Sequence, residues 1–101
     1  MSNVISIKLS DLRSASVAPP QKWCIVFEND PVTPVDFVAE VICQFCNKTE
    51  EEAYQIIGIV EKEGKCPVGA YSREIAETVS AKIMVKASEE RYPLKCYIQR
   101  V

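Results

Sequence analysis

The chain has 101 residues, of which 48% are hydrophobic and 26% are charged, with a formal net charge of -2 and no histidine. This length and this mix are typical of one globular domain that folds without metal or disulfides. The small net charge argues against nucleic-acid binding, and no apolar run approaches the ~20 residues that span a bilayer. The absence of histidine excludes Ser-His and Cys-His nucleophile pairs and His-containing zinc sites. We therefore expect no metal and no cofactor.

Residues 1–22 differ in character from the rest of the chain. They are rich in serine, contain one acid and end in the sequence APPQK. We interpret them as a flexible N-terminal arm and linker that precedes a core domain of residues 23–101. Lys8, Asp11 and Arg13 interrupt any hydrophobic stretch of a secretory signal, and an organelle transit peptide is the alternative to a flexible leader. An odd number of cysteines, five, without an export signal predicts reduced thiols in the cytoplasm.

The first half of the core predicts a strand followed by two helices. Residues 23–28 are rich in β-branched and aromatic side chains and predict a strand that ends at Asn29-Asp30. A helix follows, because apolar residues recur at spacings of three, four and seven at Val35, Val38, Val41, Ile42 and Phe45. Thr49 and Glu52 form the capping box of a second helix, which the sequence predicts to end at Gly64.

The second half predicts a strand, a helix and a final strand. Residues 65–71 read as a short strand that Pro67 places at an edge or a bulge. Ser72 is the expected cap of a third helix, whose inner side we expect to carry Ile75, Ala76, Val79, Ile83 and Ala87. In residues 95–100, polar residues alternate with Cys96 and Ile98, a pattern that predicts a last strand. The order β-α-α-β-α-β predicts an α+β fold, in which a three-stranded antiparallel sheet packs on one side against three helices.

Two short patterns have both a chemical and a structural interpretation. Cys43 and Cys46 form a CxxC pair, but they fall at the end of a predicted helix, where the dipole does not lower a thiol pKa. Two small buried hydrophobes are the favoured interpretation, and a redox pair is the alternative. A zinc site would need a second pair, whereas Cys66 and Cys96 are isolated. Asn29-Asp30 is by pattern alone more often a turn than a site.

Several short motifs, taken in their order along the chain, indicate a protein family. They are Asn29-Asp30, Thr33-Pro34, Phe37-Val38, Glu50-Glu51-Glu52-Ala53, Gln55-Ile56, Glu63-Gly64-Lys65, Ser72-Arg73-Glu74-Ile75-Ala76-Glu77-Thr78, Tyr92-Pro93-Leu94 and Cys96. In this order and spacing, the stretch from Pro19 to Val101 resembles the ClpS family. About 80 residues align without large gaps. The resemblance implies an adaptor and not an enzyme.

What the resemblance implies is a protein that binds the first residue of a substrate, Leu, Phe, Tyr or Trp, and delivers the substrate to a ClpA- or ClpC-type AAA+ unfoldase of the Clp protease. Asn29 and Asp30 would hold the α-ammonium group. The first side chain would enter a pocket lined by Thr33, Val35, Val38, Ile57, Val60 and Leu94. We expect a monomer that acts in the cytoplasm and binds peptide N-termini and the unfoldase.

The chain departs from the family pattern at three positions of this site. Pro31 stands where the family usually has a second aspartate, and Glu61 stands where it usually has a histidine. Glu61 could still accept a hydrogen bond from the ammonium group. Val35 replaces a methionine that often gates the pocket, and we hypothesise that the pocket therefore accepts more side-chain shapes, including β-branched ones.

The resemblance also places an unfoldase-facing surface on the third helix. Glu74 matches the glutamate of that surface, and Val79 stands where the family has a lysine. Residues 1–22 could engage the unfoldase pore as arms of family members do.

Three alternatives remain open at this point. The first is a divergent ClpS-like modulator that binds the unfoldase and changes its substrate choice without recognising N-termini. The second is a CxxC oxidoreductase, which requires a thiol of low pKa. The third is a stalk-type ribosomal fold, which has the same topology. It is the least favoured alternative, because such domains are usually rich in Ala and Lys and this chain is not.

Overall fold

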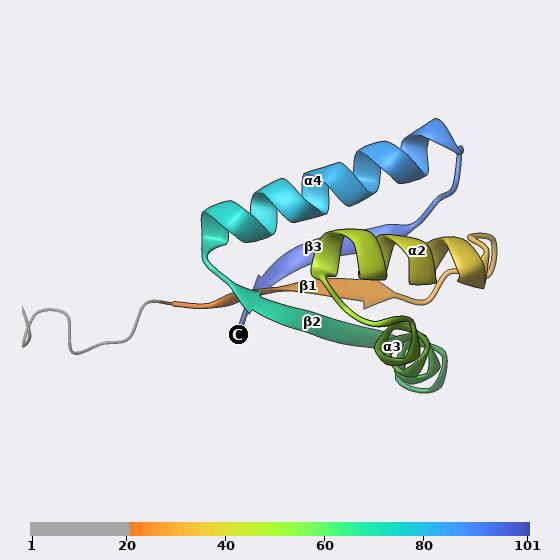
Figure 1. Cartoon of the computed structure of the whole chain (residues 1–101), viewed down its shortest axis with the longest axis horizontal. Coiled ribbons are helices and arrows are strands. Elements are labelled where there is room, and N and C mark those ends of the chain that lie inside the picture. The colour runs from red at the N-terminus through yellow and green to blue at the C-terminus, as the bar shows by residue number, and fades with distance from the viewer. Residues whose placement is uncertain (1–20) are drawn as a thin grey trace, which may run out of the picture.

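The protein, seen here as a computed structural model, is described over residues 21–101 (Figure 1). Its elements in chain order are β1 (Trp23–Glu28), α2 (Val35–Cys46), α3 (Glu50–Glu63), β2 (Lys65–Tyr71), α4 (Arg73–Glu89) and β3 (Lys95–Arg100). The predicted α+β class and the order β-α-α-β-α-β are confirmed. Of the predicted arm, only Gln21 and Lys22 belong to the described part, and residues 1–20 lie outside it.

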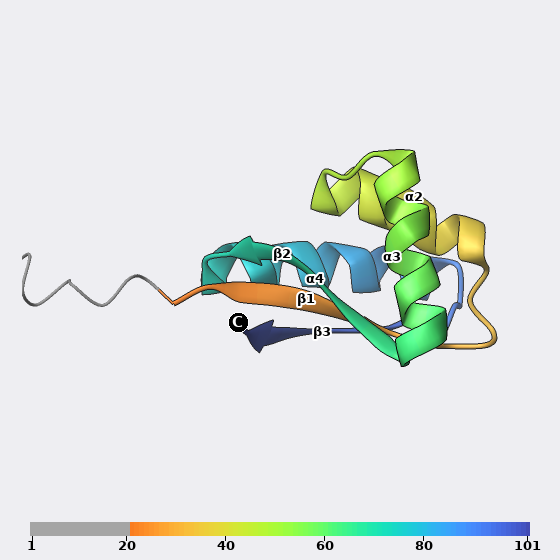
Figure 2. The same ribbon diagram turned by 90° about the horizontal axis from the view of Figure 1, so that it is seen from below.

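The three strands form one antiparallel sheet with β1 in the centre and the order β2-β1-β3. Figure 2 shows the strands side by side, with β1 between its two partners. In the register, Phe27 of β1 lies opposite Cys66 of β2 and Cys96 of β3. An irregularity interrupts the pairing of β1 with β2 between Trp23 and Ile25. Pro67 lies in the edge strand β2, as its missing N–H donor predicts.

The helix caps follow the sequence signals. The backbone N–H of Glu52 donates to Oγ1 of Thr49 at 3.1 Å, and the N–H of Thr49 donates to Oε1 of Glu52 at 2.9 Å. This is the predicted capping box, and its hydrogen bonds lower the pKa of Glu52. Gly64 ends α3 with a φ of 92°, a conformation that glycine adopts without a Cβ clash. Ser72 caps α4 by accepting from the N–H of Ile75 at 3.2 Å.

The core lies between the sheet and the helices. Its largest fully buried side chains are Phe27, Ile25, Ile42, Ile83 and Val41. The inner stripe of α4 consists of Ala76, Ile83 and Ala87, but Ile75 is 51% exposed, so its predicted inward position is wrong. Ile75 precedes Ala76 by one residue, about 100° around the helix, and therefore turns away from the stripe. The residue spacing alone predicted an inner stripe that was one residue too wide.

The packing brings three segments together at one end of β1. Figure 1 shows α4 lying along the strands, whereas α3 is seen nearly end-on beside the start of β2. The backbone N–H of Asn29 donates to the carbonyl of Gly64 at 2.9 Å. This bond ties the loop after β1 to the end of α3. The loop, the first turn of α2 and the second half of α3 therefore surround a common space.

Candidate functional site

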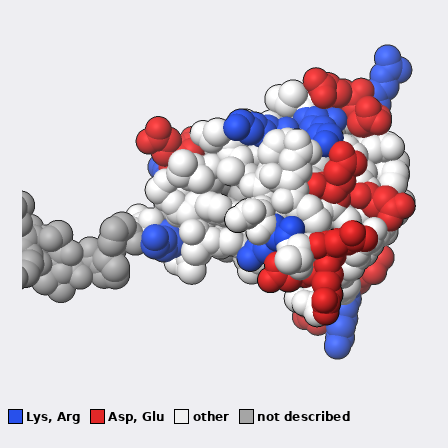
Figure 3. Space-filling model, viewed as in Figure 1, with Lys and Arg blue, Asp and Glu red and all other residues white. Residues whose placement is uncertain are grey.

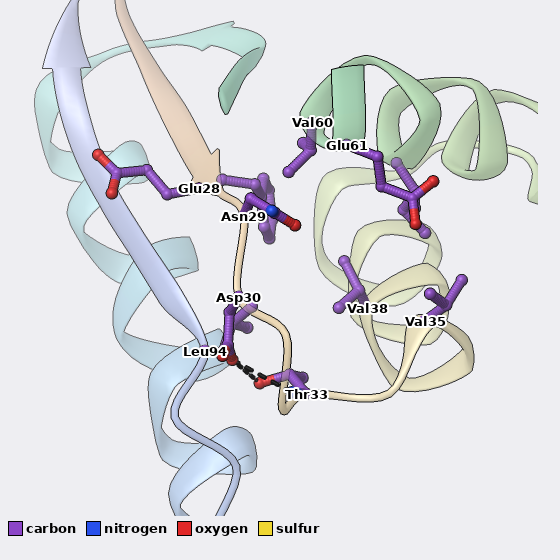
Figure 4. Close-up of a pocket in the computed structure, with 11 residues that line it drawn as sticks. Glu28, Asn29, Asp30, Thr33, Val35, Val38, Val60, Glu61 and Leu94 are labelled. Atoms are coloured by element: carbon purple, nitrogen blue, oxygen red, sulfur yellow. Dashed lines mark hydrogen bonds between the residues drawn. The ribbon is translucent and has the colours of Figure 1, made fainter. Parts of the chain in front are cut away.

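That space is a cavity of about 430 Å³, counted with its open mouth. It is lined by all nine residues that the sequence analysis placed in a binding site, namely Asn29, Asp30, Thr33, Val35, Val38, Ile57, Val60, Glu61 and Leu94. Phe27 and Glu28 complete the lining and were not predicted. Figure 4 shows these side chains around one gap between the loop, α2 and α3.

The inner walls of the cavity are apolar. Ile57 and Val60 are buried on α3, and Leu94 is buried just before β3. Phe27 belongs to the face of β1 that packs on the core, so strand alternation at the end of β1 could have identified it as a wall. Val35 is 41% exposed, because it is the first residue of α2 and stands at the mouth. The cavity therefore suits an apolar side chain that enters past Val35.

The mouth carries polar acceptors. In Figure 4 the side-chain amide of Asn29 points into the gap from the loop, and the carboxylate of Glu61 extends from α3 above Val35 on the opposite side. None of the eleven lining residues is basic. The two acceptors lie on opposite sides of the opening, an arrangement that suits a small cation with several N–H donors.

Asp30 has a different environment from its neighbour Asn29. Its Oδ1 accepts from the backbone N–H of Val32 at 3.0 Å, and its Oδ2 accepts from the N–H of Thr33 at 3.2 Å and from the Thr33 hydroxyl. Burial raises the pKa of Asp30, but the hydrogen bonds from Thr33 and Val32 and the charge of Lys95 outweigh it, so the net pKa is lowered. Asp30 is therefore a carboxylate that shapes the loop. The turn predicted from the sequence and the candidate site are the same structure.

Glu28 lines the cavity without turning its charge into it. Its Oε2 accepts a hydrogen bond from the hydroxyl of Tyr97 on β3 at 2.7 Å. Figure 4 shows the Glu28 carboxylate on the side of β1 away from the gap. This bond raises the pKa of Tyr97. Successive side chains of a strand point to opposite faces, which explains why Phe27 points to the core and Glu28 away from it.

Acidic side chains extend well beyond the mouth. Figure 3 shows Asp and Glu gathered at the end of the molecule where α2, α3 and the end of α4 lie. α3 carries five glutamates and one lysine, and α2 carries two acids and no base. A positive ligand group is therefore favoured on this side of the protein.

Comparisons with known proteins agree on one family. Residues 18–97 match the family model described as the ATP-dependent Clp protease adaptor protein ClpS. The chain belongs to the ClpS family. It is similar to the ClpS adapter proteins of Vibrio atlanticus, 37% identical over 93 residues that cover 92% of this chain and 88% of the relative, and of Neisseria meningitidis, 33% identical over 93 residues with 92% and 87% covered.

A solved ClpS structure has the same fold. The structure of Agrobacterium tumefaciens ClpS2 bound to L-phenylalaninamide matches with a TM-score of 0.78 and 23% sequence identity, and the match covers 82% of this chain and all of that one. The predicted family is thus confirmed by sequence, and the predicted fold by this neighbour. ClpS proteins are adaptors of a protease, which agrees at the family level with the expectation that the chain is not an enzyme.

The CxxC pair of this ClpS-family chain lies in the last turn of α2. Cys46 is buried and Cys43 is half-buried. Burial raises the pKa of Cys46, whereas a redox-active thiol needs a lowered pKa. The interpretation as two small apolar core residues is favoured over an oxidoreductase. Among residues 21–101, no group of His, Cys, Asp or Glu is arranged to hold a metal ion.

The residue predicted to contact a partner lies apart from the cavity. Glu74 is exposed in the first turn of α4, next to the exposed Ile75. Val79, where the family has a lysine, is half-buried against the core. Within the described part of the chain, no helix is both long and apolar enough to cross a membrane.

Proposed function

We propose that this ClpS-family chain binds the free N-terminal residue of substrate proteins, when that residue is large and hydrophobic, and delivers the substrates to a ClpA- or ClpC-type AAA+ unfoldase. One observation carries the proposal. The cavity has apolar walls, and its mouth is flanked by the Asn29 amide and the Glu61 carboxylate with no base in the lining. The α-ammonium group of a peptide needs hydrogen-bond acceptors like those at the mouth, and its first side chain, when hydrophobic, needs apolar walls like those of the cavity. The phenylalaninamide bound to the ClpS2 neighbour is a ligand of this class.

The α-ammonium group offers three donors, and its unperturbed pKa is about 7.7–8.0, so it is mostly charged at neutral pH. Asn29 and Glu61 accept from opposite sides of the mouth. Asp30 uses three hydrogen bonds within the loop, but a carboxylate has about four lone-pair sites, which leaves one for the ligand. Each charge-assisted hydrogen bond contributes about 1.5–3 kcal/mol.

The side chain of the first residue fills the inner cavity. Burying one large apolar side chain contributes about 1.5–3 kcal/mol. After the costs of association are subtracted, the two contributions support a dissociation constant on the order of micromolar. The walls that meet this side chain are Thr33, Val35, Val38, Ile57, Val60 and Leu94.

Val35 governs the range of first residues in this proposal. Its short branched side chain stands partly exposed at the mouth and leaves space that a longer, flexible side chain would occupy. We expect β-branched first residues to bind as well as Leu. Substitution Val35→Met should weaken peptides that begin with Ile or Val while Leu- and Phe-initiated peptides keep their affinity. A wild-type profile restricted to Phe, Leu, Trp and Tyr would contradict this role of Val35.

Delivery requires a second surface, for which we propose the exposed first turn of α4 around Glu74. Because Val79 lacks the charge of a lysine, we expect the contact to depend on Glu74 and on apolar neighbours. We further propose that the protein acts as a monomer in the cytoplasm and that residues 1–22 engage the unfoldase.

The test is a binding panel of peptides that differ only in the first residue, combined with a pull-down on purified unfoldase. Peptides that begin with Phe or Leu should bind, those that begin with Ser or Glu should not, and Asp30→Ala should abolish binding. Retention of the unfoldase without binding of any free N-terminus would instead favour the alternative, a modulator of the unfoldase that does not recognise N-termini.

A further inference from the structure

α3 contains a glycine that no contact within the protein explains. Gly58 lies in the middle of this 14-residue helix, and a Cβ added at Gly58 would meet no atom within 4 Å apart from its chain neighbours and the backbone of its own helix. Glycine destabilises the interior of a helix relative to alanine because of its greater backbone freedom. A close approach to a neighbouring element is the usual reason to keep one, and it is absent at Gly58 within the described residues. Gly58 is exposed, so the open space beside it, called here the Gly58 gap, can be filled by a molecule outside the chain.

The position of the gap follows from the residues one turn away on each side. Tyr54, Gly58 and Glu61 occupy one stripe of α3, four and three residues apart. The hydroxyl of Tyr54 donates to Oδ1 of Asp36 in the first turn of α2 at 2.9 Å. Glu61 lines the mouth of the cavity, and Figure 4 shows it above Val35, the neighbour of Asp36. Gly58 thus lies on α3 between two points at which this helix faces the first turn of α2, and three residues before Glu61, although Gly58 itself does not line the cavity.

We propose that this gap receives the side chain of the second residue of the bound N-terminus, with a preference for apolar side chains. The inference rests on the proposed function, because a first residue held in the cavity directs its own chain out past Glu61 and Val35. Val35 and Tyr54 are each 41% exposed, and in this proposal they provide the apolar sides of the gap. A side chain at position 58 would fill the gap itself. Gly58 therefore serves as a specificity-determining residue for the second position of the ligand.

The experiment compares three probes on the wild-type protein, Gly58→Ala, Gly58→Leu and the control Ser88→Leu, which adds a leucine at an exposed site on α4. The probes are L-phenylalaninamide, which has no second residue, and two peptides with a common tail that begin Phe-Gly and Phe-Leu. The wild-type protein should bind the Phe-Leu peptide about fivefold more tightly than the Phe-Gly peptide, the effect of partly burying one leucine. Gly58→Leu should remove that difference while phenylalaninamide keeps its affinity, and Ser88→Leu should change nothing. Gly58→Ala should keep most of the difference and raise the melting temperature.

Each failure has a distinct meaning. Equal affinity of the wild-type protein for the two peptides overturns the inference and leaves the proposed function intact, provided that phenylalaninamide binds. Loss of phenylalaninamide binding in a folded Gly58→Leu protein also overturns it, because the gap would then belong to the first-residue cavity. Failure of all three probes to bind the wild-type protein overturns the proposed function together with this inference.

Discussion

Thr33 holds the carboxylate of Asp30 through two donors, since its backbone N–H lies 3.2 Å from Oδ2 and its hydroxyl donates to the same oxygen. Thr33 is also buried and lines the cavity. This pair of residues, three positions apart, therefore determines the course of the loop after β1 and forms the loop side of the cavity.

Removal of the Thr33 hydroxyl should make this loop less rigid. Thr33→Val keeps the shape of the side chain but deletes one donor to Asp30, so we expect the free energy of unfolding to fall by about 1 kcal/mol. Affinity for a Phe-initiated peptide should fall as well, because the loop that carries Asn29 is held less firmly. Thr33→Ser is the matched control, since it keeps the donor. Chemical denaturation and peptide titration check both effects, and equal losses in the two variants would contradict the role of the hydroxyl.

Glu61 should contribute through its charge. Glu61→Gln keeps the length and an acceptor oxygen but removes the negative charge opposite Asn29, so affinity for a Phe-initiated peptide should fall about tenfold. Glu63→Gln removes the same charge from the same helix at a residue that does not line the cavity, and it should have a much smaller effect. Similar losses in both variants would mean that the general field of α3 is responsible, and not a contact with Glu61.

The pH dependence of binding should reflect the ligand. The chain has no histidine that would titrate between pH 6 and 7. The pKa of Asp30 is lowered from 3.8, so the stability contributed by its carboxylate is present above pH 4 and is lost only as pH falls through the lowered pKa. Affinity should therefore be constant from pH 6 to 7 and fall about tenfold by pH 9, as the α-ammonium group loses its proton. Peptide titrations in matched ionic strength check this, and a severalfold change between pH 6 and 7 would contradict it.

Two thiols, those of the buried Cys46 and the half-buried Cys96, should be unreactive in the folded protein. Burial raises the pKa of Cys46, and it raises the pKa of Cys96 from 9.0 to about 12. We expect iodoacetamide at pH 8 to modify all five cysteines in denaturant but to spare Cys46 and Cys96 in the native state. The raised pKa also means that Cys96 contributes stability below pH 9, which is lost as pH rises toward 12. Rapid native alkylation of Cys46, followed by mass spectrometry, would revive the oxidoreductase alternative.

Local chemistry was sufficient to predict most of the fold. The predicted strand 23–28 ends at Asn29, the strand 65–71 ends at the helix cap Ser72, and the strand 95–100 follows Pro93. All three predicted ranges agree with the structure. The error at Ile75 arose because spacings of three and four define a wide stripe, and only packing against the sheet selects its centre. The position of that centre depends on tertiary contacts, which periodicity does not contain.

The candidate site shows the same limit in more detail. The nine lining residues could be named from the family resemblance, and Phe27 could have followed from strand alternation. Alternation also turns Glu28 away from the core, but its hydrogen-bond partner Tyr97, 69 residues later in the sequence, could not be predicted, because that contact forms only when β3 pairs with β1. The same is true of the surroundings of Gly58, since the hydrogen bond from Tyr54 to Asp36 forms only when α3 meets α2.

The central claim is that the cavity holds a free N-terminal residue. The most direct measurement is calorimetric titration of the wild-type protein with two peptides that begin with Phe and differ only in acetylation of the α-amino group. Acetylation removes the positive charge between Asn29 and Glu61. The free peptide should bind with a dissociation constant on the order of micromolar and the acetylated peptide at least about 100-fold more weakly, the loss of two charge-assisted hydrogen bonds. Equal binding of the two peptides, or no binding of either, would contradict the claim.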